Sequence, residues 1–155
     1  MSNGSKAASR KARKVLWADE PAAHDYPAAE SYLGLIAEPD VVKKCTGLLF
    51  QAPTVHQYAK DILRAARLPL LDPDDLEVVK DLKKITGGQP LSPILLIRGD
   101  ITDGRPTQIA DGYHRVCASC HINEDTEIPC RLVSLPAIAA GRNGSALVAP
   151  SPVGQ

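Results

Sequence analysis

The sequence has no long apolar segment. None of its uninterrupted apolar runs approaches the ~18 residues that suggest a membrane-spanning helix, so the sequence predicts no membrane span. The first residues also lack the apolar core of a secretory signal. We therefore expect a cytoplasmic protein. Like organelle transit peptides, this segment is rich in Ser and Arg and contains no acid, so a transit peptide is an alternative that we favour less.

Aromatic side chains are scarce, and charge of one sign is missing from the N-terminal segment. Aromatics make up 4% of the 155 residues, and the formal net charge is zero. Five of the 18 basic residues lie in residues 1–14, which contain no acid, so the rest of the chain has 13 basic and 18 acidic residues. The basic segment predicts either a solubilising tail or weak contact with nucleic acid, whereas the acidic remainder and the lack of a basic patch with aromatics weigh against a nucleic-acid-binding body.

The composition divides the chain into three parts. Residues 1–14 and the Ala-, Gly-, Ser- and Pro-rich residues 137–155 are typical of disordered tails, and residues 15–136 are expected to form one domain. Apolar periodicity and turn residues predict helices over 24–38, 38–50, 60–68, 72–88 and 112–123, and strands over 53–59, 93–99, 107–111 and 127–135. This order predicts an α+β domain with a small mixed sheet and helices packed around it.

For some of these helices and strands, the sequence also predicts the roles of individual residues. In residues 24–38 we expect Tyr32, Leu33, Leu35 and Ile36 to form the apolar side of the helix. Asp72 or Asp74 is expected to cap the helix over 72–88. The run "PILLIRG" over 93–99 is continuously apolar, which is typical of a central buried strand. In the last strand, Ile128, Cys130 and Leu132 are expected on one face and Arg131 on the other.

The stretch "DGYHR" lies where a strand is predicted to turn into a helix. A helix N-terminus presents unpaired backbone N–H groups and partial positive charge. Gly112 would let a ligand approach, Arg115 offers a fork suited to phosphate oxygens, and His114 offers a titratable donor. Asp111 either caps the helix, in which case the corner is structural, or points away as a base or a Mg²⁺ ligand.

Residues 76–135 resemble the ParB/sulfiredoxin superfamily, also called the ParB-like nuclease domain. The resemblance lies in "LSPILLIRGD", a hairpin, "IADGYHRVCA" and "EIPCRLVSL", which follow a helix in the same order as in that superfamily. ParB-like domains carry D-G-x-H-R at this corner, and sulfiredoxins carry G-G-C-H-R. The segments "HDYPAAESYL" and "KDILRA" are similar to those of a bacterial subgroup that lacks both the sulfiredoxin cysteine and a helix-turn-helix domain.

The resemblance implies that the corner binds the phosphates of ATP, ADP or CTP with Mg²⁺. The matching positions are Gly112, Tyr113, His114 and Arg115 for phosphate binding, with Asp111 and His114 as catalytic residues and Asp111 as the Mg²⁺ ligand. Tyr113 stands where sulfiredoxins have their catalytic cysteine, which argues against sulfinic acid reduction. Because only a short tail follows residue 136, a chromosome-partitioning role is not expected either.

Two other predicted helices carry basic residues that are further candidates for phosphate binding. Lys80 and Lys84 lie one turn apart on the helix that lines the nucleotide in sulfiredoxins, and they either reach phosphates or form a solvated face with neighbouring acids. Lys60, Asp61 and Arg64 follow the first strand and are candidates for the same cleft.

The motif "CASCH" has the spacing of covalent haem attachment. We expect no haem, because the one methionine is Met1 and the motif lies within a predicted helix. Zinc is disfavoured because Cys117 and Cys120 share one helix face, His121 is rotated away and Cys130 lies on a strand. Buried, reduced thiols are the preferred interpretation.

Three functional hypotheses therefore remain. The first is a nucleotide-phosphate-binding ParB/sulfiredoxin-like protein, acting as a nucleotide-dependent phosphotransferase or nucleotide hydrolase. The second is a ParB-like nuclease or a DNA-associated accessory protein that uses the basic N-terminal tail. The third is a non-catalytic interaction module in which the corner is structural. The sequence does not determine the oligomeric state.

Overall fold

The computed structural model describes residues 14–134. The two predicted tails, residues 1–14 and 137–155, lie outside this range except for Lys14, as do the last residues of the predicted domain. Within the described range, none of the helices is long and apolar enough to cross a membrane.

The structure is built on a four-stranded mixed sheet in the order β1-β4-β2-β3. The strands are β1 (Thr54–Tyr58), β2 (Ile94–Ile97), β3 (Gln108–Asp111) and β4 (Glu127–Val133). β1 and β4 are antiparallel, β4 and β2 are parallel, and β2 and β3 are antiparallel. The predicted α+β fold with a small mixed sheet is therefore confirmed.

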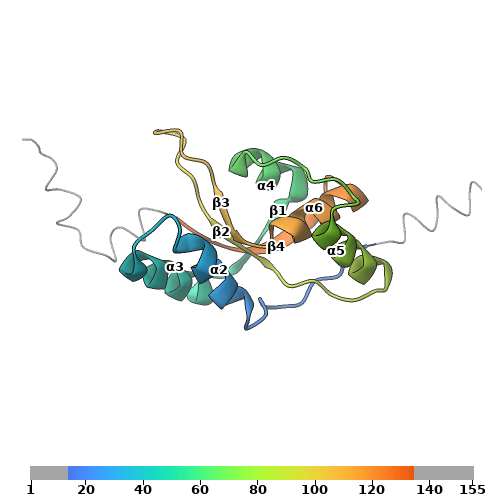
Figure 1. Ribbon diagram of the computed structural model, residues 1–155, viewed down its shortest axis with the longest axis horizontal. Helices are drawn as coiled ribbons and strands as arrows, with labels where there is room; N and C mark the ends of the chain where they lie inside the picture. Colours follow the sequence, from blue (N-terminus) through green and yellow to red (C-terminus); the bar gives the residue numbers. More distant parts are fainter. Residues whose placement is uncertain (1–13, 135–155) are drawn as a thin grey trace, which may run out of the picture.

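Five helices cover the sheet in the described range, and Figure 1 shows them in two groups. α2 (Asp25–Leu33) and α3 (Pro39–Gln51) lie on one side, and α4 (Ala59–Ala66), α5 (Leu76–Thr86) and α6 (Tyr113–Ile122) lie on the other. The connection between β2 and β3 projects from the body at the top of the view. Each helix group packs on its own apolar cluster, so the sheet separates two cores.

The central strand β2 explains why there are two cores. Its four residues are all buried, as its continuous apolar run predicts. Because side chains alternate along a strand, Ile94 and Leu96 join the core under α4, α5 and α6, whereas Leu95 and Ile97 join the core under α2 and α3. A strand covered on both faces has no polar alternation, and this is the pattern that the sequence carries.

The predicted apolar side of the first helix is largely wrong. α2 ends at Leu33, and turn hydrogen bonds from Leu35 to Tyr32 and from Ile36 to Leu33 replace the next helical turn. Leu35 and Ile36 are consequently 83% and 55% exposed. The residues that α2 buries against the core are Ala29 and Leu33, which are four positions apart and so lie on the same face.

The cap of α5 also differs from expectation. Asp75 is the N-cap, and its side chain accepts hydrogen bonds from the backbone N–H groups of Glu77 and Val78. Asp72 and Asp74 lie too early in the chain to cap a helix that begins at Leu76. On the sheet, Ile128, Cys130 and Leu132 pack into one core while Arg131 points to the other face, as predicted.

Candidate functional site

The predicted corner is formed where β3 ends at Asp111 and α6 begins at Tyr113. Gly112 between them has a φ of 112°, a conformation that residues with a Cβ rarely adopt. A Cβ at this position would lie 2.4 Å from the Ile94 Cδ1 atom and 2.9 Å from the Arg115 Nη2 atom. The glycine is therefore required by the backbone and by close packing on β2, whether or not a ligand approaches.

Asp111 does not cap α6. No side chain among residues 14–134 caps the helix at Gly112, and the Asp111 carboxylate instead lies 3.0 Å from the Arg115 Nη2 atom. Of the two orientations left open by the sequence, the structure has the one in which Asp111 turns away from the helix N–H groups. These N–H groups are therefore not occupied by the carboxylate.

Arg115 is held by a second carboxylate from a distant part of the chain. Its Nη1 atom lies 3.7 Å from Oδ1 of Asp25, the first residue of α2, and its Nη2 atom donates to the Pro93 carbonyl at 3.4 Å. The Asp25 side chain is 2% exposed and also accepts a hydrogen bond from the Ala22 backbone N–H. We refer to Asp25, Asp111 and Arg115 as the ion-pair cluster.

The ion-pair cluster changes the role of Arg115. The arginine side chain is 16% exposed, and its one positive charge faces two carboxylates. Because these carboxylates offset its positive charge, this guanidinium attracts a phosphate less strongly than an unpaired arginine would. The sequence did not indicate Asp25 as a site residue, since local patterns carry no signal for a pair between the start of α2 and the first turns of α6.

Burial and charge shift the acid–base properties of this region. Burial raises the pKa of Asp111 above its usual value, the neighbouring Asp25 carboxylate raises it further, and Arg115 opposes both effects. Burial also raises the pKa of Asp81 on α5, against the opposing influence of Arg115, Lys84 and His114. Asp111 therefore binds a proton more readily than an exposed aspartate does. This property favours a role as a proton acceptor.

A cavity of about 480 Å³ opens beside the corner. It lies between α2, β3, the end of α4 and the start of α6, and a cavity of this size accommodates a small ligand. Its lining includes four predicted residues and two polar residues that the sequence did not indicate, namely Asp111, Gly112, Tyr113, His114, Tyr32 and Gln108. The uncapped N-terminus of α6 thus faces a cavity.

Two tyrosines shape this cavity. The Tyr113 hydroxyl donates to the Pro69 carbonyl at 2.7 Å, which ties α6 to the segment after α4. The Tyr32 hydroxyl donates to the Gln108 side chain and ties α2 to β3. Both hydroxyls are therefore engaged within the protein. His114, whose ring centroid lies 5.6 Å from that of Tyr113, has no hydrogen bond to the protein within the described range.

The other predicted phosphate ligands do not line this cavity. Lys80 pairs with Glu77 at 3.1 Å and is 69% exposed, in agreement with the solvated-face interpretation. Lys84 is exposed on the same helix. Lys60, Asp61 and Arg64 line a different cavity on α4, where Lys60 pairs with Asp125 at 2.5 Å. The part of α4 that reaches the corner is its end, at Ala66.

The cysteines of "CASCH" lie in the core. Cys117 is fully buried and Cys120 is half-buried, and burial raises the pKa of both thiols. Burial raises the pKa of Cys130 to about 12. The His121 ring bonds to the Leu71 carbonyl at 2.6 Å. Within residues 14–134, no group of three or more Cys, His, Asp or Glu residues is placed to hold a metal ion.

The Mg²⁺ that the family resemblance implies has one donor in this cavity. Asp111 is the single carboxylate among the lining residues. Mg²⁺ is usually bound through one or two carboxylates, and phosphate oxygens and water complete its octahedron. The residues present therefore fit a Mg²⁺ that arrives with a phosphate ligand, and they do not fit a site made by protein side chains alone.

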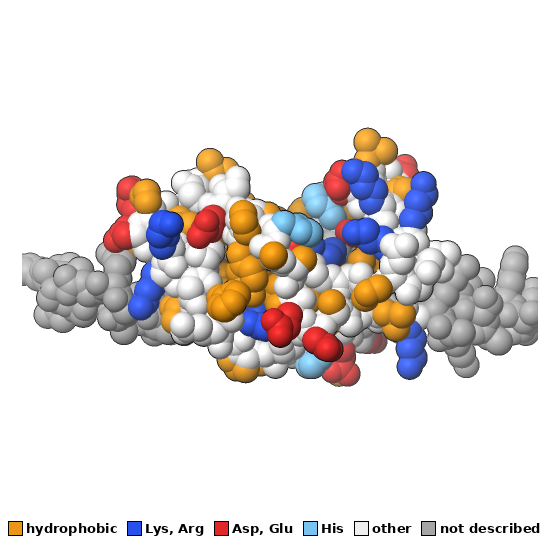
Figure 2. Space-filling view, turned by 90° about the horizontal axis from the view of Figure 1, so that it is seen from below, with side chains coloured by type: hydrophobic (Ala, Val, Ile, Leu, Met, Phe, Trp, Pro, Cys, Tyr) orange, Lys and Arg blue, Asp and Glu red, His pale blue; other side chains and the backbone are white. Residues whose placement is uncertain are grey.

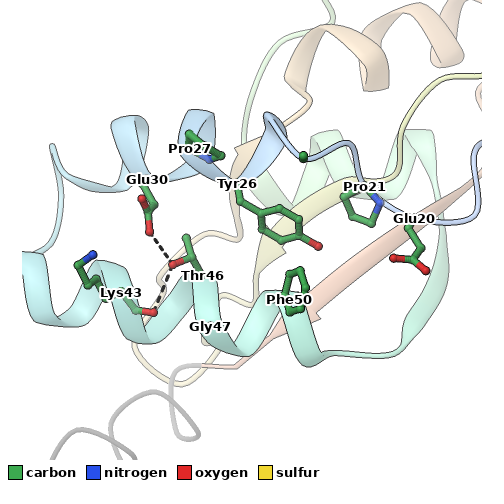
Figure 3. Close-up of a pocket in the computed structure, with 10 residues that line it drawn as sticks. Glu20, Pro21, Tyr26, Pro27, Glu30, Lys43, Thr46, Gly47 and Phe50 are labelled. Atoms are coloured by element: carbon green, nitrogen blue, oxygen red, sulfur yellow. Dashed lines mark hydrogen bonds between the residues drawn. The ribbon is translucent and has the colours of Figure 1, made fainter.

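A larger cavity of about 650 Å³ lies away from the corner, between α2, α3 and the segment before α2. Figure 3 shows the Tyr26 and Phe50 rings, which meet edge to face, near the middle of the view, and Glu30 bonded to the Thr46 hydroxyl to their left. None of its lining residues lines the cavity at the corner, and none is a predicted site residue.

Surface charge is mixed on the face seen in Figure 2. Basic and acidic side chains are interspersed there, and an apolar patch lies near the middle of the view. This face therefore offers no continuous basic surface for a nucleic-acid backbone. The predicted contact through the basic N-terminal tail concerns residues that lie outside the described range, apart from Lys14.

Comparison with known proteins adds no assignment. No family model, curated protein or solved structure matches the chain. The resemblance to the ParB/sulfiredoxin superfamily therefore remains a prediction from the motif and the order of its flanking elements.

Proposed function

We propose that this protein is a cytoplasmic nucleotide-binding protein whose ligand occupies the cavity at the start of α6. The observation that carries the proposal is the uncapped N-terminus of α6, which opens at Gly112, Tyr113 and His114 onto a cavity of about 480 Å³. Backbone N–H groups at a helix N-terminus favour phosphate. The ligand would place a phosphate there, and His114 would donate to it.

Arg115 contributes to this site indirectly, through the two carboxylates that it contacts. Two carboxylates close to a phosphate would repel it, and Arg115 offsets their charge through its contacts of 3.0 Å with Asp111 and 3.7 Å with Asp25. The role of Arg115 in this proposal is therefore to position and neutralise Asp111, and the direct phosphate contacts come from the helix N–H groups and His114. This differs from the role that the family resemblance implies for Arg115.

Asp111 is the residue best placed for chemistry. Its carboxylate lines the cavity, and its raised pKa makes it a better proton acceptor than an exposed aspartate. In a phosphotransferase or a hydrolase, this group would accept the proton of the attacking hydroxyl or water. Asp111 would hold a Mg²⁺ that arrives with the nucleotide, and the ion would supply positive charge to offset that of the phosphates.

A thermal-shift panel tests binding. ATP, ADP, CTP and GTP are each added with and without Mg²⁺, and at one hundred times Kd a true ligand stabilises the folded protein by about 2.7 kcal/mol. We expect a rise in Tm with at least one nucleotide and Mg²⁺. The variant His114→Ala should lose most of this rise, and His56→Ala, whose histidine lies on β1 outside the cavity, should keep it.

The contradicting result is equally clear. If no nucleotide at millimolar concentration raises the Tm, or if His114→Ala responds as the wild type does, the proposal is wrong. The "DGYHR" corner would then be explained by the ion-pair cluster and by the packing of Gly112 on Ile94. That outcome would favour the non-catalytic interaction module.

A further inference from the structure

The two edges of the sheet are treated differently. The β3 edge is covered, because α2 packs against it, Tyr32 bonds to Gln108 and the Thr107 N–H donates to the Ala65 carbonyl at 3.0 Å. β1 forms the opposite edge and, among the described residues 14–134, pairs with β4 alone. Four of its five residues are exposed. Natural sheets usually protect such an edge, so the contrast calls for an explanation.

The backbone direction of β1 follows from one hydrogen bond. The Ala59 N–H donates to the Thr126 carbonyl at 2.9 Å, in line with the register that pairs Tyr58 with Glu127. Hydrogen-bonded and non-bonded pairs alternate along an antiparallel ladder. Val55 and Gln57 therefore direct their backbone groups toward β4. Thr54 and His56 direct theirs outward from the sheet, as does the N–H of Tyr58.

Pro129 agrees with this alternation. It lies opposite His56, and a residue without an N–H fits a pair that exchanges no hydrogen bonds. Among residues 14–134, no backbone partner is found for the outward N–H and C=O groups of Thr54 and His56 or for the Tyr58 N–H. The Tyr58 C=O belongs to α4, because Tyr58 is the N-cap of that helix. The edge thus presents a row of donors and acceptors at the spacing of an extended strand.

The chemistry of β1 matches a second β1. The strand "TVHQY" carries no charged residue, so pairing it with itself brings no like charges together. Lys60, the first charged residue after the strand, is paired with Asp125 in the same chain at 2.5 Å. Lysine, proline and bulges are the usual devices that block an edge strand, and none occurs within β1.

We propose that β1 pairs antiparallel with β1 of a second copy of this chain, around a two-fold axis through His56. In this register Thr54 lies opposite the other copy's Tyr58, and the two His56 residues face each other. The two His56 residues then exchange both of their backbone hydrogen bonds, each Tyr58 N–H donates to the other copy's Thr54 carbonyl, and the two four-stranded sheets become continuous. The interface is isologous, as in most homodimers.

Sedimentation of the full chain tests the interface. The wild type should sediment as a dimer, and His56→Pro should raise the dimer dissociation constant about tenfold or more. The reason is that proline removes an N–H that points outward and leaves the β4 ladder intact. Gln57→Ala changes a side chain on the other face of the strand and should leave the dimer unchanged.

Cross-linking provides a second measurement that does not depend on proline. In His56→Cys, the two introduced thiols face each other across a hydrogen-bonded pair with a Cα–Cα distance of about 5.5 Å, within the range that a disulfide spans. Oxidation should give a covalent dimer with His56→Cys and much less with Gln57→Cys. The wild type is the negative control. Its own thiols should cross-link little, because Cys45, Cys117 and Cys130 are buried and Cys120 is half-buried.

The outcomes are decisive in either direction. A wild type that remains monomeric at the highest soluble concentration overturns the proposal. So does a dimer that neither weakens in a folded His56→Pro protein nor cross-links at position 56, because it must then use another surface. If His56→Pro fails to fold by circular dichroism, the cross-linking pattern at positions 56 and 57 decides.

Discussion

One buried and one half-buried arginine show how differently one residue type is used in this protein. Arg115 on α6 faces the carboxylates of Asp111 and Asp25. Arg131 on β4 is 9% exposed and has no carboxylate partner among residues 14–134; its Nη1 atom donates to the carbonyls of Leu49 and Phe50. In both side chains the Nε atom is buried and has no hydrogen-bond partner in the part of the chain that the structure describes.

The difference concerns what each charge stabilises. Arg131 lies at the last turn of α3, where backbone carbonyls point out of the helix and a positive charge is favourable. It therefore acts as a cap that joins α3 to the sheet. Arg115 instead compensates the negative charges of the buried Asp25 and the half-buried Asp111 beside a cavity. The hydrogen bonds of Arg131 involve carbonyl groups, which do not titrate, whereas the ion pairs of Arg115 depend on the protonation of Asp111.

The largest effect is expected from Arg115→Met, which keeps a long apolar side chain and removes the charge. Breaking a buried ion pair by removing one partner typically costs about 3–5 kcal/mol in the free energy of unfolding. Without Arg115, the two carboxylates repel each other, and acidification relieves this repulsion by protonating Asp111. Urea unfolding should thus show a larger loss at pH 7 than at pH 4. An equal loss at both values would contradict an electrostatic role.

A smaller effect is expected from Arg131→Met, the matched change on β4. The variant loses charge-assisted hydrogen bonds to the end of α3, and we expect about 1–3 kcal/mol of destabilisation. Because carbonyl groups do not titrate, the loss measured by urea unfolding should be the same at pH 5 and pH 8. A loss of unfolding free energy larger than that of Arg115→Met would contradict the expected order of the two variants.

The smallest effect is expected from Asp111→Asn. The pKa of Asp111 is raised above its usual value in the folded state, so the folded protein binds this proton more tightly than the unfolded chain. Stability linked to Asp111 is thus present at low pH and is lost as the pH rises through the folded-state pKa. The introduced amide cannot titrate, so the free energy of unfolding should be unchanged or about 1 kcal/mol higher at pH 7. The pH dependence of unfolding should also be flatter than in the wild type, and a steeper one would contradict the direction of the shift.

Local patterns in the sequence predicted most of the elements. Ile62, Leu63 and Ala66 are buried on α4 as their spacing indicates, and the apolar run of β2 is the central strand. Errors occurred at helix ends, where one or two hydrogen bonds decide which residue begins or ends the helix. Side-chain bonds make Asp75 rather than Asp72 or Asp74 the cap of α5, and backbone turn bonds at Leu35 and Ile36 end α2 at Leu33.

The candidate site was predictable only in part. The sequence placed Asp111, Gly112 and His114 at a strand-to-helix corner, and the structure places them beside a cavity. It did not indicate Tyr32 or Gln108, because they reach the cavity through the packing of α2 on β3. Lys60 and Arg64 lie on the helix that ends at the cavity, but they line a different one.

The sequence by itself determined the periodicity of the strands and helices and the residues of the corner, because these depend on neighbours within a few positions. The tertiary structure alone decided the partner of Arg115. Asp25 lies at the start of α2, and only the packing of α2 against β3 brings its carboxylate to the α6 arginine. It also decided that β1 and β3 form the edges of the sheet, since strand order depends on contacts between distant segments. Pairing and burial over such separations leave no local pattern in the sequence.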